Sequence, residues 1–94
     1  MATKSIIQAD KQCYVCHTTE NLEDHHIFFG ANRKVSEKLG LKIYLCAQHH
    51  RGNFSPHRVR EVDIIYKQLA QKTYELSHSR AEFMQEIGRN YLEE

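Results

Sequence analysis

The sequence predicts an α+β fold in which a two-stranded hairpin precedes a helical C-terminal part. Two segments, 22–28 and 41–45, are rich in apolar and β-forming residues and are bounded by turn-forming residues, as strands are. From residue 59 onward, apolar side chains recur at spacings of three and four, which indicates an amphipathic helix. The 94 residues have the length of one small domain, 1–94, and no linker divides them.

Cysteine usage and hydropathy narrow the class of protein. Three cysteines cannot close a disulfide framework, and the Cys13-x-x-Cys16 spacing suits a metal knuckle. We expect residues 1–10 to be a loose leader or a short extension. They lack an apolar core long enough for a signal peptide. No segment is as long and apolar as a membrane span. The sequence therefore predicts a cytoplasmic protein in a reducing compartment, without a membrane partner.

The formal net charge of +1 does not by itself indicate a nucleic-acid-binding protein. The charges are unevenly divided, however, with seven Lys and Arg against five acids up to Phe54 and six against seven after it. Bound divalent ions would add positive charge to the first part. Modest basicity of this kind can support weak, salt-sensitive binding to phosphates.

The elements follow from local signals. The strand 22–28 ends at Gly30, and the polar, basic stretch 31–39 forms either two helical turns closed by Gly40 or a solvated connection. The alternating segment 41–45 is the second strand, which pairs with the first as a hairpin with a long connection.

Two helices are expected over residues 56–94, as support for the core. Ser55 as cap and Pro56 at the first helical position predict the start of a helix of about 18 residues. Its apolar stripe should face the hairpin and consists of Val59, Val62, Tyr66 or Ile65, Leu69 and Thr73. Ser79 and Glu82 have the spacing of a capping box that opens a second helix.

Four residues have the type and spacing of structural zinc ligands: Cys13, Cys16, Cys46 and His49. A C-x2-C pair, a gap of 29 residues and a C-x2-H pair give two ligand pairs, which suits tetrahedral zinc. Free buried thiols are the alternative, and the paired spacing argues against them. Structural Zn²⁺ would contribute on the order of 10 kcal/mol of folding free energy, as it does in zinc-finger peptides.

The remaining histidines of this region suggest a second metal site beside the zinc. His25, His26, His50 and His57 lie close to the zinc pattern in the sequence. Neighbours on a strand point to opposite faces, so His25 and His26 can serve different tasks. For any single histidine, the alternative is a core side chain satisfied by hydrogen bonds.

Three segments together resemble the pattern of HNH endonucleases, and more narrowly the small HNH proteins common in bacteriophage genomes: Cys13-x2-Cys16, Glu23-Asp24-His25-His26-Ile27 and Leu45-Cys46-Ala47-Gln48-His49-His50. Segments 33–41 and 88–92 also resemble this phage group, so the resemblance covers most of residues 13–92. If the chain is encoded by a phage, its expected location is the cytoplasm of the host cell.

The resemblance implies a ββα-metal fold over residues 13–57, in which a hairpin and a helix hold one divalent cation. At the matching positions, His26 would be the general base, and His25 and His50 would be metal ligands. His57 would be a third ligand if its loop folds back, and the sequence leaves this open.

The chain departs from the family pattern at two positions. His49 stands where a cysteine usually binds zinc, and Leu41 lies near the expected place of the middle Asn, with Asn53 on the other side of the site. Because the Asn mainly orients the loop that carries the base, its loss bears on efficiency more than on the chemistry.

The implied activity is hydrolysis of a DNA phosphodiester bond. Neutral His26 would take a proton from the attacking water, and the metal would stabilise charge on the phosphoryl group and the leaving 3′-oxygen. The ion would be Mg²⁺, Mn²⁺, Ni²⁺, Co²⁺ or Zn²⁺, and a histidine-rich site favours the last four over Mg²⁺. One site cuts one strand, so a monomer would nick double-stranded DNA, whereas a homodimer could cut both strands. Arg33, Lys34 and Arg51 flank the site and are the expected DNA contacts.

A second class of function uses the same residues differently. A non-catalytic zinc module could bind DNA, or a phage or host protein partner, through its surface alone. The nuclease requires His26 to be unligated, whereas the binding module requires only the zinc ligands. The place of His26 therefore separates the two hypotheses.

Overall fold

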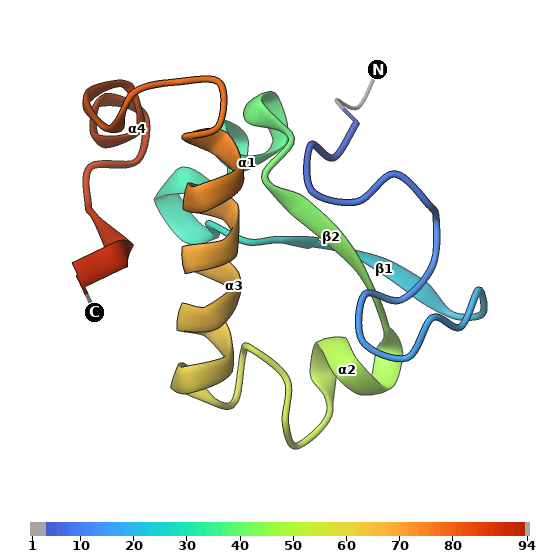
Figure 1. The fold of residues 1–94 in the computed structure, drawn as a ribbon. Helices are drawn as coiled ribbons and strands as arrows, with labels where there is room; N and C mark the ends of the chain where they lie inside the picture. Colours follow the sequence, from blue (N-terminus) through green and yellow to red (C-terminus); the bar gives the residue numbers. More distant parts are fainter. Residues whose placement is uncertain (1–3, 94) are drawn as a thin grey trace.

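The computed structural model describes residues 4–93 and confirms the α+β class (Figure 1). Strands β1 (Leu22–His26) and β2 (Lys42–Cys46) pair as the predicted antiparallel hairpin, with Leu22 opposite Cys46 and His26 opposite Lys42. The helical elements within the described residues are η1 (Gly30–Asn32), α1 (Arg33–Leu39), α2 (Ala47–Arg51), α3 (Arg60–Tyr74), α4 (Arg80–Ile87) and η2 (Tyr91–Glu93).

The connection between the strands contains the helical turns that the sequence allowed. Helix α1 ends at Gly40, whose φ of 72° is left-handed and therefore suits glycine. Ser36 is fully buried, donates a hydrogen bond to the carbonyl of Leu41 and accepts one of 3.3 Å from the N–H of Phe28. These contacts hold α1 against the end of the hairpin, and the stretch is not a solvated loop.

Residues 4–10, the described part of the predicted leader, lie along β2. The hydroxyl of Ser5 donates to the carbonyl of Lys42 at 2.5 Å, and the N–H of Tyr44 donates to Oε1 of Gln8 at 2.9 Å. The outer edge of β2 is thereby partly hydrogen-bonded.

Among the described residues, no helix is both long and apolar enough to cross a membrane.

One core joins the hairpin to the C-terminal helices. Leu41, Ile43 and Leu45 are buried at alternate positions around β2, while Phe83 and Ile87 are buried one turn apart in α4. The Phe28 and Phe83 rings lie 5.7 Å apart between centroids, so Phe28, two residues after β1, packs directly on α4.

Helix α3 crosses beside the hairpin, but its buried face differs slightly from the predicted stripe (Figure 1). Its most buried apolar residues are Tyr66, Ala70 and Tyr74, which are spaced four residues apart. The half-buried Val62 lies four residues before Tyr66 on the same face. Ile65, the alternative to Tyr66, is 59% exposed.

The predicted helix start at Ser55 is wrong, because α3 begins at Arg60. The carbonyl of Ser55 accepts hydrogen bonds from the N–H groups of Arg58 and Val59, at 3.0 and 2.9 Å, which form a separate turn. Val59 is extended, with φ −120° and ψ 110°, so the turn cannot continue into the helix. This turn carries His57, one of the predicted metal ligands.

The second predicted helix start is confirmed. The N–H of Glu82 donates to the hydroxyl of Ser79 at 3.1 Å, and the N–H of Ser79 donates to the Glu82 carboxylate at 3.0 Å. Gly88 ends α4 with a φ of 89°, as expected for a left-handed cap.

Candidate metal centres

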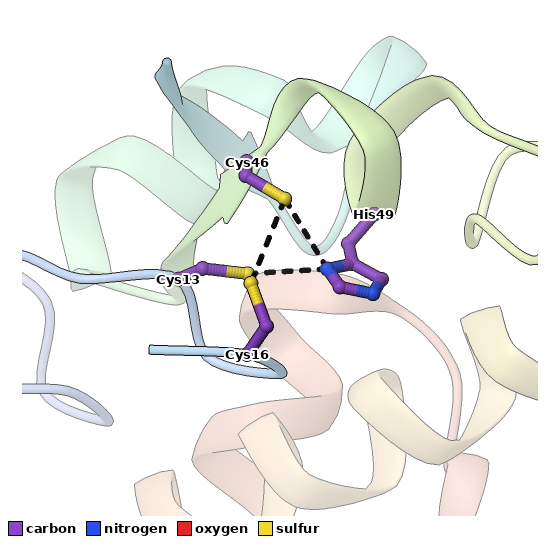
Figure 2. A group of neighbouring side chains, drawn as sticks. All are labelled: Cys13, Cys16, Cys46 and His49. Carbon is purple, nitrogen blue, oxygen red and sulfur yellow. Dashed lines mark hydrogen bonds between the residues drawn. The ribbon is translucent and has the colours of Figure 1, made fainter. Parts of the chain in front are cut away.

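Three segments bring the four predicted zinc ligands together (Figure 2). Cys13 and Cys16 lie on a turn before β1, in which the carbonyl of Cys13 accepts a hydrogen bond of 2.9 Å from the N–H of His17. Cys46 ends β2, and His49 follows one helical turn later in α2. The cluster thus ties the chain preceding the hairpin to the chain leaving it.

The distances within this cluster match those between ligands on one small ion. Tetrahedral zinc with its usual bond lengths separates two sulfurs by about 3.8 Å and a sulfur from a nitrogen by about 3.5 Å. The sulfurs of Cys16 and Cys46 lie 3.9 Å apart, and Nδ1 of His49 lies 3.5 Å from the Cys13 sulfur and 3.2 Å from the Cys46 sulfur. All four ligand atoms fall within 4.8 Å of one another.

The local electrostatics also favour a cation. Burial alone would raise the pKa of the Cys13 thiol, but hydrogen bonds from the backbone of Cys16, Cys46 and Val15, together with one from His49, lower the pKa to about 6. A thiolate is the zinc-binding form of cysteine. The four side chains therefore form a cluster consistent with structural zinc.

A second cluster contains three histidines from three different elements. His25 comes from β1, His50 from α2, and His57 from the turn before α3, and each offers one ring nitrogen within 4.8 Å of the others. Nε2 of His50 and Nε2 of His57 are 3.2 Å apart. Two nitrogens bound to one ion at about 2.1 Å are about 3.0 to 3.4 Å apart in octahedral or tetrahedral geometry. These residues could hold a divalent ion.

His25 is the buried member of this cluster, with 1% of its surface exposed. Burial, followed by the positive charge that His50 and His57 carry when protonated, lowers the pKa of His25 to about 3, so its ring is neutral. Its Nε2 is buried and has no hydrogen-bond partner among the described residues. An unpaired buried nitrogen is costly, and a bound ion would satisfy it.

Glu23 is hydrogen-bonded to the ring nitrogen of His50 that does not face His57. Its Oε1 accepts a hydrogen bond of 2.7 Å from Nδ1 of His50, and its Oε2 pairs with Nη2 of Arg51 at 2.7 Å. The bond from His50 is the largest cause that lowers the pKa of the Glu23 carboxyl, and Arg51 adds to it. Arg51, a predicted DNA contact, is therefore paired within the protein, although its side chain remains 66% exposed.

His26 lies outside both clusters. Its Nε2 is 3.7 Å from a carboxylate oxygen of Glu37, and partial burial, with the positive charge of Arg33 next, lowers its pKa. His26 nevertheless lines a small pocket of about 220 Å³ together with the three histidines of the second cluster. The pocket is lined by Asp24, His25, His26, Phe29, Arg33, His50 and His57.

The remaining predicted site residues are only partly gathered at this pocket. Arg33 lines it, whereas Lys34, its neighbour at the start of α1, is exposed and does not. Leu41, near the expected place of the middle Asn, is fully buried in the core, and Asn53 lines a different pocket beside His49.

Two residues near the histidine cluster were not anticipated from the sequence. Glu23 could have been found, because strand alternation places it on the same face as His25, two residues later. Lys67, 8% exposed, lies 2.5 Å from Asp63 and 4.3 Å from the centre of the Phe29 ring. No sequence signal marked Lys67, since it sits within a helical pattern of core residues.

The chain matches no family model, and no curated protein or solved structure matches it either. The case for function therefore rests on the residues and their geometry.

Proposed function

We propose that this chain is a metal-dependent endonuclease of the HNH type, which nicks DNA by hydrolysing a phosphodiester bond within a ββα-metal core. The observation that carries the proposal is the separation of the histidines into three positions. His49 belongs to the cysteine cluster, His25, His50 and His57 form a second cluster, and His26 stands apart at the same pocket. A zinc module that only binds a partner has no need for the second cluster or for the separate histidine.

In this proposal, His25, His50 and His57 hold one divalent ion, which when bound supplies Lewis-acid stabilisation of charge on the scissile phosphate. His26 acts as general base and accepts a proton from the attacking water. The lowered pKa of His26 supports this role, because its ring is neutral at physiological pH and can accept a proton.

A plasmid-nicking assay tests the activity directly. Zinc-loaded protein is incubated with supercoiled plasmid and, in turn, Mg²⁺, Mn²⁺, Ni²⁺, Co²⁺ or additional Zn²⁺. We expect open circles to accumulate before linear DNA, with the least cleavage in Mg²⁺, because imidazole nitrogens suit the other ions better. A His26→Ala protein purified in parallel controls for contaminating nucleases. Intact plasmid with all five ions would contradict the proposal.

We expect the start of α1 to contact the DNA backbone. Arg33 lines the histidine pocket, and Lys34, the next residue in the chain, is exposed. The double change Arg33→Gln, Lys34→Gln should weaken binding about equally for all DNA sequences. It should also reduce the slope of log affinity against log salt by up to about 1.8, since each phosphate contact contributes about 0.9.

Fluorescence anisotropy with two duplexes of unrelated sequence, at several salt concentrations, measures this effect. The matched control replaces two exposed lysines on other parts of the chain, Lys4→Gln and Lys72→Gln, and therefore removes the same net charge. Equal slopes for the two double variants would assign Arg33 and Lys34 to an ordinary solvated surface.

One observation favours the alternative of a non-catalytic zinc module that binds DNA or a protein. Phe54 is 81% exposed at the edge of a pocket of about 600 Å³, which Val15 and Tyr66 also line beside His49. An exposed aromatic residue of this kind is common in binding surfaces. Tight partner binding by a protein that cuts no DNA with any of the ions above would favour this function.

A further inference from the structure

We propose that Glu23 is a positioning residue for the histidine cluster, which fixes His50 in the tautomer that presents Nε2 to the metal ion. The inference rests on the proposed function, because it assumes that His50 is a ligand. It adds a residue that lies outside the ligand set and sets the geometry of one ligand.

The alternation of β1 places Glu23 and His25 on one face of the strand. His50 on α2 lies against both of them, since its Nδ1 is 2.7 Å from Glu23 and its ring centroid is 5.2 Å from that of His25. Asp24, between them, is exposed and lines the histidine pocket. Glu23 is the acidic residue of β1 whose carboxylate forms a hydrogen bond with a histidine of the cluster.

The hydrogen bond determines which nitrogen of His50 carries the proton. A neutral imidazole has one donor and one acceptor nitrogen, and an ionised carboxylate can only accept. The proton therefore lies on Nδ1, facing Glu23, and the lone pair lies on Nε2. That same Nε2 is the atom found 3.2 Å from Nε2 of His57. A carboxylate behind a ligating histidine is a common way to orient it and to increase its basicity.

Glu23 is itself held in place from α2. Its second carboxylate oxygen pairs with Nη2 of Arg51 at 2.7 Å, so the carboxylate bridges two consecutive residues of that helix. Arg51 thereby keeps one oxygen of Glu23 directed away from His50, and leaves the other for the ring. Loss of Arg51 should consequently matter less than loss of Glu23.

The test measures metal binding without DNA. Protein carrying one measured zinc is titrated with Ni²⁺ by calorimetry, with His25→Ala defining binding outside the histidine cluster, and zinc content is checked again afterwards. We expect Glu23→Ala to weaken Ni²⁺ binding by about 10- to 100-fold, the usual range for a lost outer partner of a ligand. Glu23→Gln should lose less, because its amide oxygen can still accept from Nδ1. Arg51→Gln should lose the least.

Glu20→Gln is the charge-matched control, since Glu20 is exposed just before β1. It should leave Ni²⁺ affinity within about twofold of the wild type. Melting temperatures identify variants that fail to fold, and in that event Glu23→Gln, which keeps the side-chain shape, carries the comparison. Nitrogen-15 NMR of the zinc-loaded protein without Ni²⁺ reports the tautomer directly. His50 should carry its proton on Nδ1 in the wild type and shift toward Nε2 in Glu23→Ala.

Unchanged Ni²⁺ affinity in Glu23→Ala would overturn the inference, and so would a loss of affinity without any change in the His50 tautomer. If the wild type binds Ni²⁺ and nicks DNA while Glu23→Ala does both equally well, the inference alone fails. If the wild type shows no Ni²⁺ binding beyond that of His25→Ala, the proposed function fails with it.

Discussion

Replacing Cys46 by serine is expected to release zinc and unfold most of the protein. Cys46 is 7% exposed, and its sulfur lies 3.9 Å from that of Cys16 and 3.2 Å from Nδ1 of His49. A structural zinc contributes on the order of 10 kcal/mol, which is comparable to the entire stability of a small domain at about 5 to 15 kcal/mol. The remaining three ligands cannot hold the ion with similar affinity.

Elemental analysis and a thermal melt followed by circular dichroism measure the two effects together. Val15→Ser is the matched control, because it introduces the same residue into the turn between Cys13 and Cys16 at a position that is 46% exposed. It should keep one zinc per chain and nearly the same melting temperature. Chelation of zinc from the wild type should reproduce the Cys46→Ser melt. A wild type that contains no zinc and yet melts cooperatively would refute the assignment.

Replacing His26 by alanine should reduce cleavage by about 100-fold or more, the usual scale for loss of a general base. Zinc content and melting temperature should remain nearly unchanged, because His26 belongs to neither cluster. Its ion pair with Glu37 is long, at 3.7 Å between Nε2 and the carboxylate oxygen. The measurement is the rate of plasmid nicking at saturating metal, alongside a melt of the same protein. Activity that survives the change intact would remove His26 from the role of base.

Replacement of the proposed metal ligands His25 and His50 should have a different effect from replacement of His26. His25→Ala and His50→Ala should weaken binding of the second ion, so excess metal should restore part of their activity. The same excess should not restore His26→Ala, since that variant lacks a proton acceptor and not a ligand. Rescue of His26→Ala to the same degree would instead assign His26 to metal binding.

The sequence predicted the parts of the fold that depend on local patterns. Alternation predicted β2, apolar residues bounded by turn residues predicted β1, and the capping pair Ser79 and Glu82 predicted the start of α4, because these signals act over a few residues. Ser55 and Pro56 wrongly predicted the start of α3, because they belong to a separate turn and Val59, which follows that turn, is extended. That turn is set by packing around it, which local preference does not encode.

The same distinction applies to the candidate site. Ligand type and paired spacing were sufficient to group Cys13 with His49, because few arrangements place two such pairs on one ion. The convergence of His57 on His50 depends on how the turn after α2 folds back, so the sequence left it open. Strand alternation places Glu23 on the face of His25, but its hydrogen bond to His50 depends on how α2 packs against β1, which the sequence does not indicate.

Helix α2 has only five residues, Ala47–Arg51, yet it supplies His49 to one cluster and His50 to the other. Successive helical residues are rotated by about 100°, so this one turn directs neighbouring rings toward two different clusters. An ion bound at either cluster would restrain that turn. Binding of an ion at the other cluster would then cost less conformational entropy. Binding at the two centres is therefore expected to be cooperative, and by thermodynamic linkage each ion must favour the other to the same extent.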